Sequence, residues 1–321
     1  MRYITLLVLI SMIGWLYADR VQNLSSKKIY QVDDGLAQYN LAMRYDTGLG
    51  VDRNKREAIK WLRLSAEKHF SRAQYNLGLC YYYGDGVEQD YLAAIDWFSM
   101  AANQGLPEAQ YSLGLCHALG QGMEQDCNVA VQWFRRAAEQ GYSKAQYCLG
   151  CCYYFGEGVG ENRDEAFKWY SRAANSGYAK AQYSLGCCLD FGEGTKQDIQ
   201  TAFQWYSNAA QQGHPGAQYN LGTCYYNGDG VALDLAEAVK WYNKAAEQGF
   251  ANAQFALGKC YNLGIGVGRD DYEAIFWWKL AAANGHETAQ YAFEQISKEL
   301  TQEELQQLQI KAEMWSAKHS R

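Results

Sequence analysis

The sequence predicts an all-α solenoid built from seven copies of a 36-residue helix–turn–helix unit. The tripeptide Ala-Gln-Tyr recurs every 36 residues from Ala37 to Ala289, and one copy, at Ala253, has Phe in place of Tyr. Paired glycines follow each of the first seven tripeptides at a constant distance, and one Trp stands at a constant position in each unit. A period of about 20 to 50 residues is typical of solenoids. We therefore expect the function to lie on a surface rather than in one catalytic pocket.

The first half of each unit is predicted to be a helix that ends in a glycine turn. Counting the Ala of Ala-Gln-Tyr as position one, position five is always Leu, from Leu41 to Leu257. Position six is Gly in every unit but the first, which has Ala42. Positions twelve and fourteen are always Gly, as at Gly84 and Gly86. Such glycines permit the positive φ angles that a helix C-terminus and its turn require.

The second half of each unit is predicted to be another helix. Position eighteen is always Asp or Asn, as at Asp90, and its side chain can cap the amides that open a helix. Positions twenty-two and thirty are always Ala, and position twenty-five is always Trp, which we expect to fill the space between helices. Gly at position thirty-three, as at Gly105, ends this helix in all but the first unit. The predicted units are 37–72, 73–108, 109–144, 145–180, 181–216, 217–252 and 253–288.

The two ends of the chain depart from the repeat. Arg2 precedes an uncharged, apolar run from Tyr3 to Ala18, so residues 1–18 are predicted to be a signal peptide, because the run is short for a spanning helix of about 20 residues. An uncleaved anchor is the alternative. Residues 19–36 are expected to form a linker and N-terminal cap. Residues 289–321 are expected to form a partial repeat and a closing helix, introduced by a capping box at Thr301 and Glu304.

The second unit shows the whole motif: Ala73-Gln74-Tyr75-Asn76-Leu77-Gly78, Tyr81, Gly84-Asp85-Gly86-Val87, Asp90, Ala94, Trp97-Phe98 and Ala101-Ala102. This motif resembles that of the Sel-1-like repeat family, which is related to the tetratricopeptide repeats. The resemblance extends from Ala37 to about Gly285. It implies an α/α right-handed superhelix that binds other proteins, without indicating a particular partner.

One branch of that family is secreted and rich in cysteines that join neighbouring repeats. Those cysteines would fall at about Ala102 and Gln110, where this chain has none. The departure weakens the functions that this branch implies, which are penicillin binding and a β-lactamase-like hydrolase activity. They are kept as an alternative, together with a structural role in an envelope export assembly.

Composition and motifs argue against several function classes. The chain has 29 Lys and Arg against 35 Asp and Glu, a net charge of −6. This charge argues against nucleic-acid binding, which calls for a clustered basic surface. The five histidines are scattered, and the Gly-x-Gly pairs join two helices instead of following a strand, as phosphate loops do. We therefore predict no enzyme activity and no cofactor.

The ten cysteines do not suggest a disulfide framework. Position eight is Cys in six successive units, and we call these residues the cysteine ladder: Cys80, Cys116, Cys152, Cys188, Cys224 and Cys260. Stacked helices lie ~8–10 Å apart, whereas a disulfide needs Cα atoms within ~7 Å. We expect the ladder to be buried as small apolar side chains. Pairing of Cys127, Cys148, Cys151 and Cys187 is left open, and no metal site is predicted because no histidine or fourth thiol completes one.

A helical wheel divides the first helix into two faces. At 100° per residue, positions one, five, eight, nine and twelve share one side, which we predict to be core. Positions three, four, seven, ten and eleven share the other, which we call the open face. In this class of superhelix that face lines the concave groove. Its central residues are aromatic and apolar, so the predicted partner-binding residues are Tyr82, Tyr83, Leu115, Tyr154, Phe155, Asp190, Phe191 and Tyr226.

These observations favour a non-enzymatic, exported adaptor or scaffold that holds a protein or peptide segment in the groove. The competing interpretation is that the aromatic residues stack on one another and on the next helix, and only tighten the superhelix. The expected location is the periplasm or the exterior in a bacterium, or the lumen of the endoplasmic reticulum in a eukaryote. Membrane contact is expected only through the signal segment, and the oligomeric state is not predicted.

Overall fold

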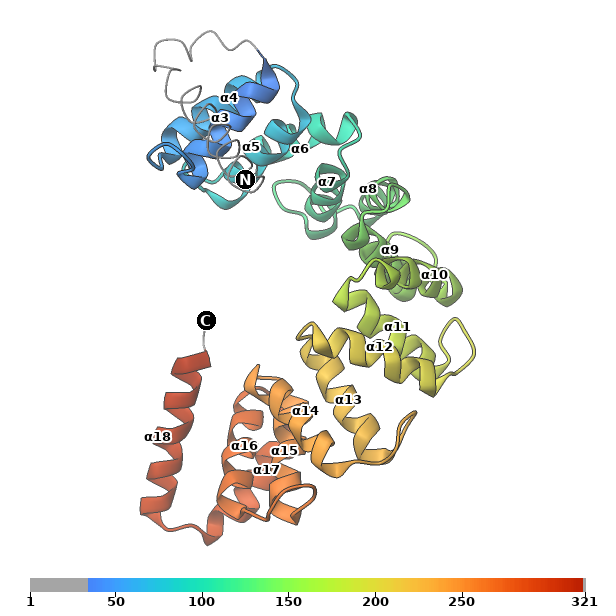
Figure 1. Ribbon diagram of the computed structural model, residues 1–321, viewed down its shortest axis with the longest axis vertical. Helices are drawn as coiled ribbons and strands as arrows, with labels where there is room; N and C mark the ends of the chain where they lie inside the picture. The colour runs from blue at the N-terminus through green and yellow to red at the C-terminus, as the bar shows by residue number, and fades with distance from the viewer. Residues whose placement is uncertain (1–33, 320–321) are drawn as a thin grey trace, which may run out of the picture. The chain divides into compact units, whose positions relative to one another are not determined.

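The computed structural model describes residues 34–319, which contain sixteen α-helices, one short 3₁₀ helix and no strand (Figure 1). The predicted signal peptide and most of the predicted N-terminal cap lie outside the described residues. The first helices of the seven repeats are α3 (Gly35–Thr47), α5 (Ser71–Tyr83), α7 (Pro107–Leu119), α9 (Ser143–Phe155), α11 (Ala179–Phe191), α13 (Pro215–Asn227) and α15 (Ala251–Leu263).

The second helices have the same length of 13 residues. They are α4 (Lys55–Glu67), α6 (Tyr91–Asn103), α8 (Cys127–Glu139), α10 (Arg163–Asn175), α12 (Ile199–Gln211), α14 (Leu235–Glu247) and α16 (Asp271–Ala283). The chain ends with α17 (Glu287–Ile296), the 3₁₀ helix η1 (Ser297–Glu299) and α18 (Gln302–His319). The all-α repeat fold is therefore confirmed.

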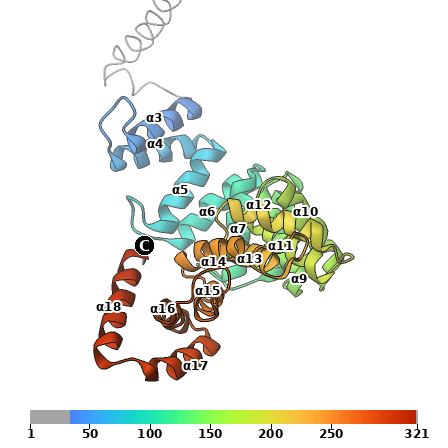
Figure 2. The ribbon, with the colours of Figure 1, turned by 60° about the horizontal axis from the view of Figure 1, so that its bottom comes forward.

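The chain divides into two compact units, Met1–Asp126 and Cys127–Arg321. Within each unit the helices pack in chain order. Where both lie in the same unit, a first helix packs against the second helix of its own repeat, as α5 does on α6, and a second helix packs against the next first helix, as α10 does on α11 (Figure 2). This consecutive packing is that of a solenoid. No helix within residues 34–319 is both long and apolar enough to cross a membrane.

The predicted helix ends are confirmed. Gly84 caps α5 with a φ of 69° and donates its N–H to the Cys80 carbonyl. The Asp90 side chain accepts a hydrogen bond of 3.0 Å from the Ala93 amide at the start of α6. The glycine C-cap and the Asp or Asn N-cap recur along the chain. Together they fix where each helix ends and the next begins, and so the length of the repeat.

The first helices begin two residues earlier than the predicted repeat boundaries. Position thirty-four, as at Phe70, is extended and acts as the N-cap residue, and the helix starts at the next residue. Pro107 and Pro215 occupy the first helical position, where proline is favoured. Gly35 and Leu36 accordingly belong to α3 and not to a leading cap, and the Asp34 side chain caps this helix.

In five of the repeats the core contains an aromatic ring packed on a glycine. A Cβ atom added to Gly186 at position six would lie 2.7 Å from the ring of Tyr206 at position twenty-six. The same pair recurs as Gly78–Phe98, Gly150–Tyr170, Gly222–Tyr242 and Gly258–Trp278. The first repeat has Ala42 with Leu62 instead, both buried in one cluster. The smaller Leu62 explains why this repeat alone accommodates a Cβ at position six.

The tryptophans at position twenty-five fill the core less than predicted. Trp61, Trp169 and Trp277 are buried, whereas the other four are half-buried. Successive residues lie 100° apart around the helix, so positions twenty-five and twenty-six point in different directions. The side chain at position twenty-six is the one that packs in the centre of the core. Some of these tryptophan rings contact the cationic side chain at position twenty-eight. The Arg136 guanidinium, for example, lies 4.5 Å from the centre of the Trp133 ring.

Neighbouring repeats are joined by the glutamine of Ala-Gln-Tyr, which is buried in all seven repeats. The Gln182 amide donates to the Ala174 carbonyl of the preceding second helix at 3.3 Å. Its side-chain oxygen accepts a hydrogen bond of 2.7 Å from Gln212. A buried amide needs such partners, so this glutamine is fixed by the stacking of repeats and not by its own helix.

The closing helix forms as predicted. The Thr301 amide donates to the Glu304 carboxylate at 2.8 Å, and the Glu304 amide donates to the Thr301 hydroxyl at 3.3 Å, which is the predicted capping box. Leu308 and Ala312 of α18 are buried in the cluster that contains Phe276 of α16. The closing helix therefore covers apolar residues of the last full repeat.

The glycine–ring contact predicts a specific pattern of stability changes. Gly186→Ala should lower the free energy of unfolding by about 1–3 kcal/mol, because the new methyl group overlaps the Tyr206 ring. In a Tyr206→Leu background the same change should cost less than about 0.5 kcal/mol, since it recreates the Ala42–Leu62 pair and a helical Ala is favoured over Gly. Urea unfolding of the native chain, the two single variants and the double variant measures both costs. Equal costs in the two backgrounds would contradict this account.

Candidate partner-binding surface

Position eleven is the most exposed part of the open face. The exposed fraction is 71% for Tyr83, 64% for Phe155 and 71% for Phe191, and Leu119 and Leu263 at the same position are also exposed. Each of these residues is the last of its helix and precedes the capping glycine, so no further helical turn covers it. Single exposed apolar side chains are common on protein surfaces. A group of large ones on one face usually marks a binding site.

The tyrosines at position ten have a different environment. The Tyr154 hydroxyl donates to the Glu193 carboxylate of the next repeat at 2.5 Å. The Tyr82 hydroxyl donates in the same way to the Gln121 side chain. Both tyrosines are half-buried. For these two residues the competing interpretation is supported, because they join neighbouring repeats.

Arg163, the first residue of α10, completes the surroundings of Tyr154. Its guanidinium carbon lies 3.6 Å from the centre of the Tyr154 ring. Its nitrogens lie 2.8 Å from the Glu161 carboxylate and 3.6 Å from the Glu193 carboxylate. The chain thus holds a cation between an aromatic ring and two carboxylates at the edge of the open face.

A cavity of about 190 Å³ lies between α9 and α11. We call it the thiol notch, because Cys151 and Cys187 line it. Its lining residues are Tyr147, Cys151, Tyr154, Phe155, Tyr170, Tyr183, Ser184, Cys187, Cys188 and Glu193. Two predicted site residues, Tyr154 and Phe155, therefore meet at one apolar cavity that opens beside an exposed ring.

The thiols of the notch are poor nucleophiles. Burial raises the pKa of both Cys151 and Cys187, although hydrogen bonds from tyrosine hydroxyls partly oppose this. The Tyr170 hydroxyl lies 3.4 Å from the Cys151 sulfur. A raised pKa keeps a thiol protonated at neutral pH and therefore unreactive. The notch is suited to binding rather than to covalent chemistry.

None of the ten cysteines forms a disulfide in the structure, and the six of the ladder are buried as predicted. This answers the question left open for Cys127, Cys148, Cys151 and Cys187, which form no disulfide. In the part of the chain that the structure describes, no three His, Cys, Asp or Glu side chains converge in a way that could hold a metal ion.

A second cavity, of about 520 Å³, lies between α3 and α5 in the other compact unit. We call it the first notch. It is lined by Met43, Asp46, Lys55, Leu62, Asn76, Leu79, Cys80, Tyr83 and Asp85. Its lining comes largely from the same repeat positions as that of the thiol notch, and it again includes an exposed position-eleven ring, here Tyr83. The notch is thus a product of the repeat and not of one local irregularity.

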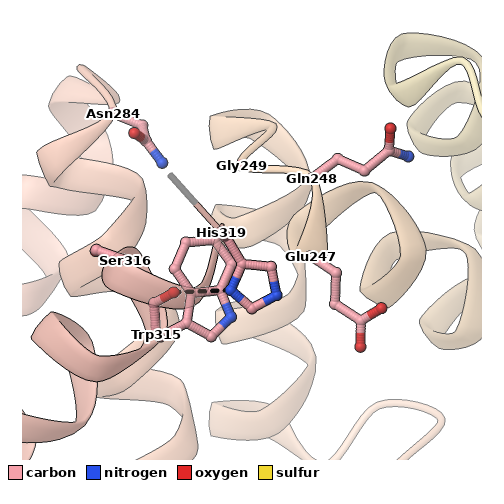
Figure 3. Close-up of a pocket in the computed structure, with 7 residues that line it drawn as sticks. All are labelled: Glu247, Gln248, Gly249, Asn284, Trp315, Ser316 and His319. Carbon is pink, nitrogen blue, oxygen red and sulfur yellow. Dashed lines mark hydrogen bonds between the residues drawn. The ribbon is translucent and has the colours of Figure 1, made fainter. Parts of the chain in front are cut away.

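A third cavity, of about 450 Å³, lies near the C-terminus and is lined by Glu247, Gln248, Gly249, Asn284, Trp315, Ser316 and His319 (Figure 3). The His319 ring stacks on Trp315 at 4.2 Å and takes up one face of that side chain. This cavity contains none of the predicted site residues.

The predicted site residues thus fall into two groups. Tyr83, Phe155 and Phe191 are exposed, whereas Tyr82, Leu115, Tyr154, Asp190 and Tyr226 are half-buried. Their role in binding stays a prediction. Sequence reasoning missed Glu193 and Arg163, although a carboxylate between the paired glycines of the turn, at position thirteen, was a visible signal.

Comparison with known proteins identifies the repeat. The family model described as Sel1 repeat matches seven times, at residues 35–70, 71–106, 107–142, 143–178, 179–214, 215–250 and 251–286. Each match begins at the first residue of a first helix, as the structure has it. Among curated proteins, none matches the chain.

Two solved structures are similar over most of the chain. One is c5321, a protective antigen present in uropathogenic Escherichia coli strains and displaying an SLR fold, with 36% identity and a TM-score of 0.85. That match covers 92% of this chain and 63% of the other, so this chain spans less than two thirds of the length of c5321. The other is a Sel1 repeat protein from Oxalobacter formigenes, with 36% identity, a TM-score of 0.68 and coverage of 82% and 76%.

The difference between positions ten and eleven can be measured. Tyr154→Phe should lower the free energy of unfolding by about 1.5 kcal/mol, because it removes a hydrogen bond to a carboxylate in the next repeat. Phe155→Ser should change it by less than about 0.5 kcal/mol, since the ring is largely exposed. Urea unfolding compares the two. A larger cost for Phe155→Ser would mean that this ring is structural.

Proposed function

We propose that this chain, which belongs to the Sel1 repeat family, is a non-enzymatic adaptor that holds a segment of a partner protein on the open face of its first helices. Sel1 repeat proteins are generally protein-interaction scaffolds. The observation that carries the finer proposal is the exposure of large apolar side chains at position eleven, above all Phe155 and Phe191.

The energetics favour these rings as anchors. Burying apolar surface is worth roughly 25 cal/mol per Å², and aromatic anchors commonly dominate the affinity of an interface. Because each ring stands at the capped end of a packed helix, little backbone freedom is lost when a partner covers it. The thiol notch beside Phe155 adds an apolar cavity that can receive a side chain of the partner.

Export is part of the proposal. Its support is the uncharged, apolar run from Tyr3 to Ala18 after Arg2, which has the layout of a signal peptide. The intact mass of the protein recovered from its source tests this. A mass that still includes residues 1–18 would contradict cleavage, and recovery from the cytoplasm alone would contradict export.

A crosslinking pull-down tests the binding surface. The partner captured by the native chain is identified by mass spectrometry, and its affinity is then measured for a Phe155→Ser, Phe191→Ser double variant. Each lost anchor should cost ~2 kcal/mol, about thirtyfold in affinity, so the double variant, which loses ~4 kcal/mol, should bind roughly several hundredfold more weakly. The matched control is Leu92→Ser with Leu233→Ser, which removes two equally exposed apolar side chains outside the open face.

The comparison between the two double variants decides the outcome. A loss of affinity confined to the Phe155 and Phe191 variant supports an adaptor that works through the open face. Equal affinity in both variants, with both still helical by circular dichroism, would place the partner elsewhere and refute the proposed surface.

A further inference from the structure

The first notch contains a cation that the chain supplies itself. The Lys55 ammonium, at position nineteen, lies 2.8 Å from the Asp46 carboxylate and 2.5 Å from the Asp85 carboxylate. Asp46 is at position ten of its repeat, and Asp85 is at position thirteen of the next. Two carboxylates from neighbouring repeats are therefore bridged by one side chain from the second helix.

A related arrangement borders the thiol notch. Arg163 is also at position nineteen, and its guanidinium reaches Glu193 at position thirteen of the next repeat while lying on the Tyr154 ring at position ten. Where position nineteen is basic, its cation thus occupies the rim between two first helices. We call this location the rim site.

The rim site between the fifth and sixth repeats has the carboxylates without the cation. Asp190 is at position ten and Asp229 is at position thirteen of the next repeat, as Asp46 and Asp85 are in the first notch. Position nineteen is Ile199, however, and not Lys or Arg. Within residues 34–319, neither carboxylate forms an ion pair with Lys or Arg. Asp190 accepts from the Tyr206 hydroxyl at 3.1 Å, and Asp229 accepts from the Asn227 amide at 3.0 Å.

Each carboxylate pair lies close enough to the ladder cysteine of the following repeat to raise its pKa. Burial raises the pKa of Cys80, the Lys55 ammonium lowers it, and Asp85 and Asp46 raise it. Burial, followed by Asp190 and Asp229, raises the pKa of Cys224 to about 12. Of these two thiols, Cys80 has a nearby cation that lowers its pKa, and Cys224 has none among its causes.

The surroundings fit a cationic side chain with an apolar stem. Phe191, next to Asp190, is 71% exposed, and Ile199 is 36% exposed. Lys and Arg bury their aliphatic stems on such apolar surface while the charged head meets its partner, and an aromatic face attracts a cation. Two half-buried carboxylates without a counter-ion make this rim site negatively charged.

We propose that the Asp190–Asp229 rim site receives a lysine or arginine side chain of the bound partner segment, in the place that Lys55 takes between Asp46 and Asp85. This inference rests on the proposed function and specifies the partner chemistry: a segment in which a basic residue stands beside an apolar one. The apolar side chain covers Phe191, and the charged head lies between the two carboxylates.

The decisive variant supplies the cation from within the chain. Ile199→Lys recreates the Lys55 arrangement and should exclude the basic side chain of a partner. Leu235→Lys is the matched control, because it adds a lysine at position nineteen of the next repeat, where positions ten and thirteen are Tyr226 and Ile265 and offer no carboxylate. The probe is a library of random 12-residue peptides displayed on phage, selected on the full chain.

Selected peptides should be enriched in Lys or Arg next to an apolar residue. They should bind Ile199→Lys about tenfold more weakly than the native chain, and they should bind Leu235→Lys unchanged. Peptides that require Phe155 or Phe191 but carry no basic residue, or that ignore Ile199→Lys, would overturn this inference and leave the proposed function intact. Peptides that bind the Phe155→Ser, Phe191→Ser variant as well as the native chain would overturn the proposed function itself.

An unfolding measurement tests the rim site without any ligand. Ile199→Lys should be at least as stable to urea as Ile199→Gln, because the new ammonium meets two carboxylates that form no ion pair with Lys or Arg. A Lys variant less stable than the Gln variant would show that the rim does not hold a cation, whatever the peptide selection gives.

Discussion

The contact between a bare helix surface at position six and a ring at position twenty-six is what the other features of the repeat depend on. Because Gly186 has no side chain, the Tyr206 ring lies directly on the backbone of α11. The helices of a repeat are consequently held at close range by one large, well-packed group, at the density typical of protein interiors. The alanines at positions twenty-two and thirty maintain the same close approach along the second helix.

That close approach determines what remains for the surface. Positions one, five and eight of the first helix pack in the core, and the glutamine at position two bonds to the preceding repeat. Position ten reaches the following repeat, as Tyr154 does through Glu193. Position eleven stays exposed, and in five of the seven repeats it carries a large apolar or aromatic side chain, namely Tyr83, Leu119, Phe155, Phe191 and Leu263. In our proposal this surface holds an extended partner segment, and the charges of the rim sites select which segment binds.

Much of the fold followed from local chemistry that one repeat contains. The glycine turns, the Asp and Asn caps, the capping box at Thr301 and the burial of the cysteine ladder were all predicted, because each depends on residues close in sequence or on one helical face. The deep position of Tyr206 was missed because a wheel of one helix does not show which neighbouring residue sits opposite a glycine on another helix.

The candidate site was harder to predict for a related reason. The wheel placed Tyr154 and Phe155 on one face, yet Tyr154 is half-buried by Glu193 of the next repeat and by Arg163 of the next helix, whereas Phe155 is exposed. Whether an aromatic residue is structural or available depends on side chains about 40 residues away, and no single-helix pattern contains this information. The charged rim was missed for the same reason, since it joins two repeats.

Hydroxyl-radical footprinting of the partner complex tests the central claim most directly, because it reports which side chains lose contact with water. Our account predicts that a bound partner protects Phe155 and Phe191 from oxidation and leaves Leu92 and Leu233 as reactive as in the free protein. Protection of Leu92 and Leu233 with unchanged oxidation of Phe155 and Phe191 would show that the partner binds another surface.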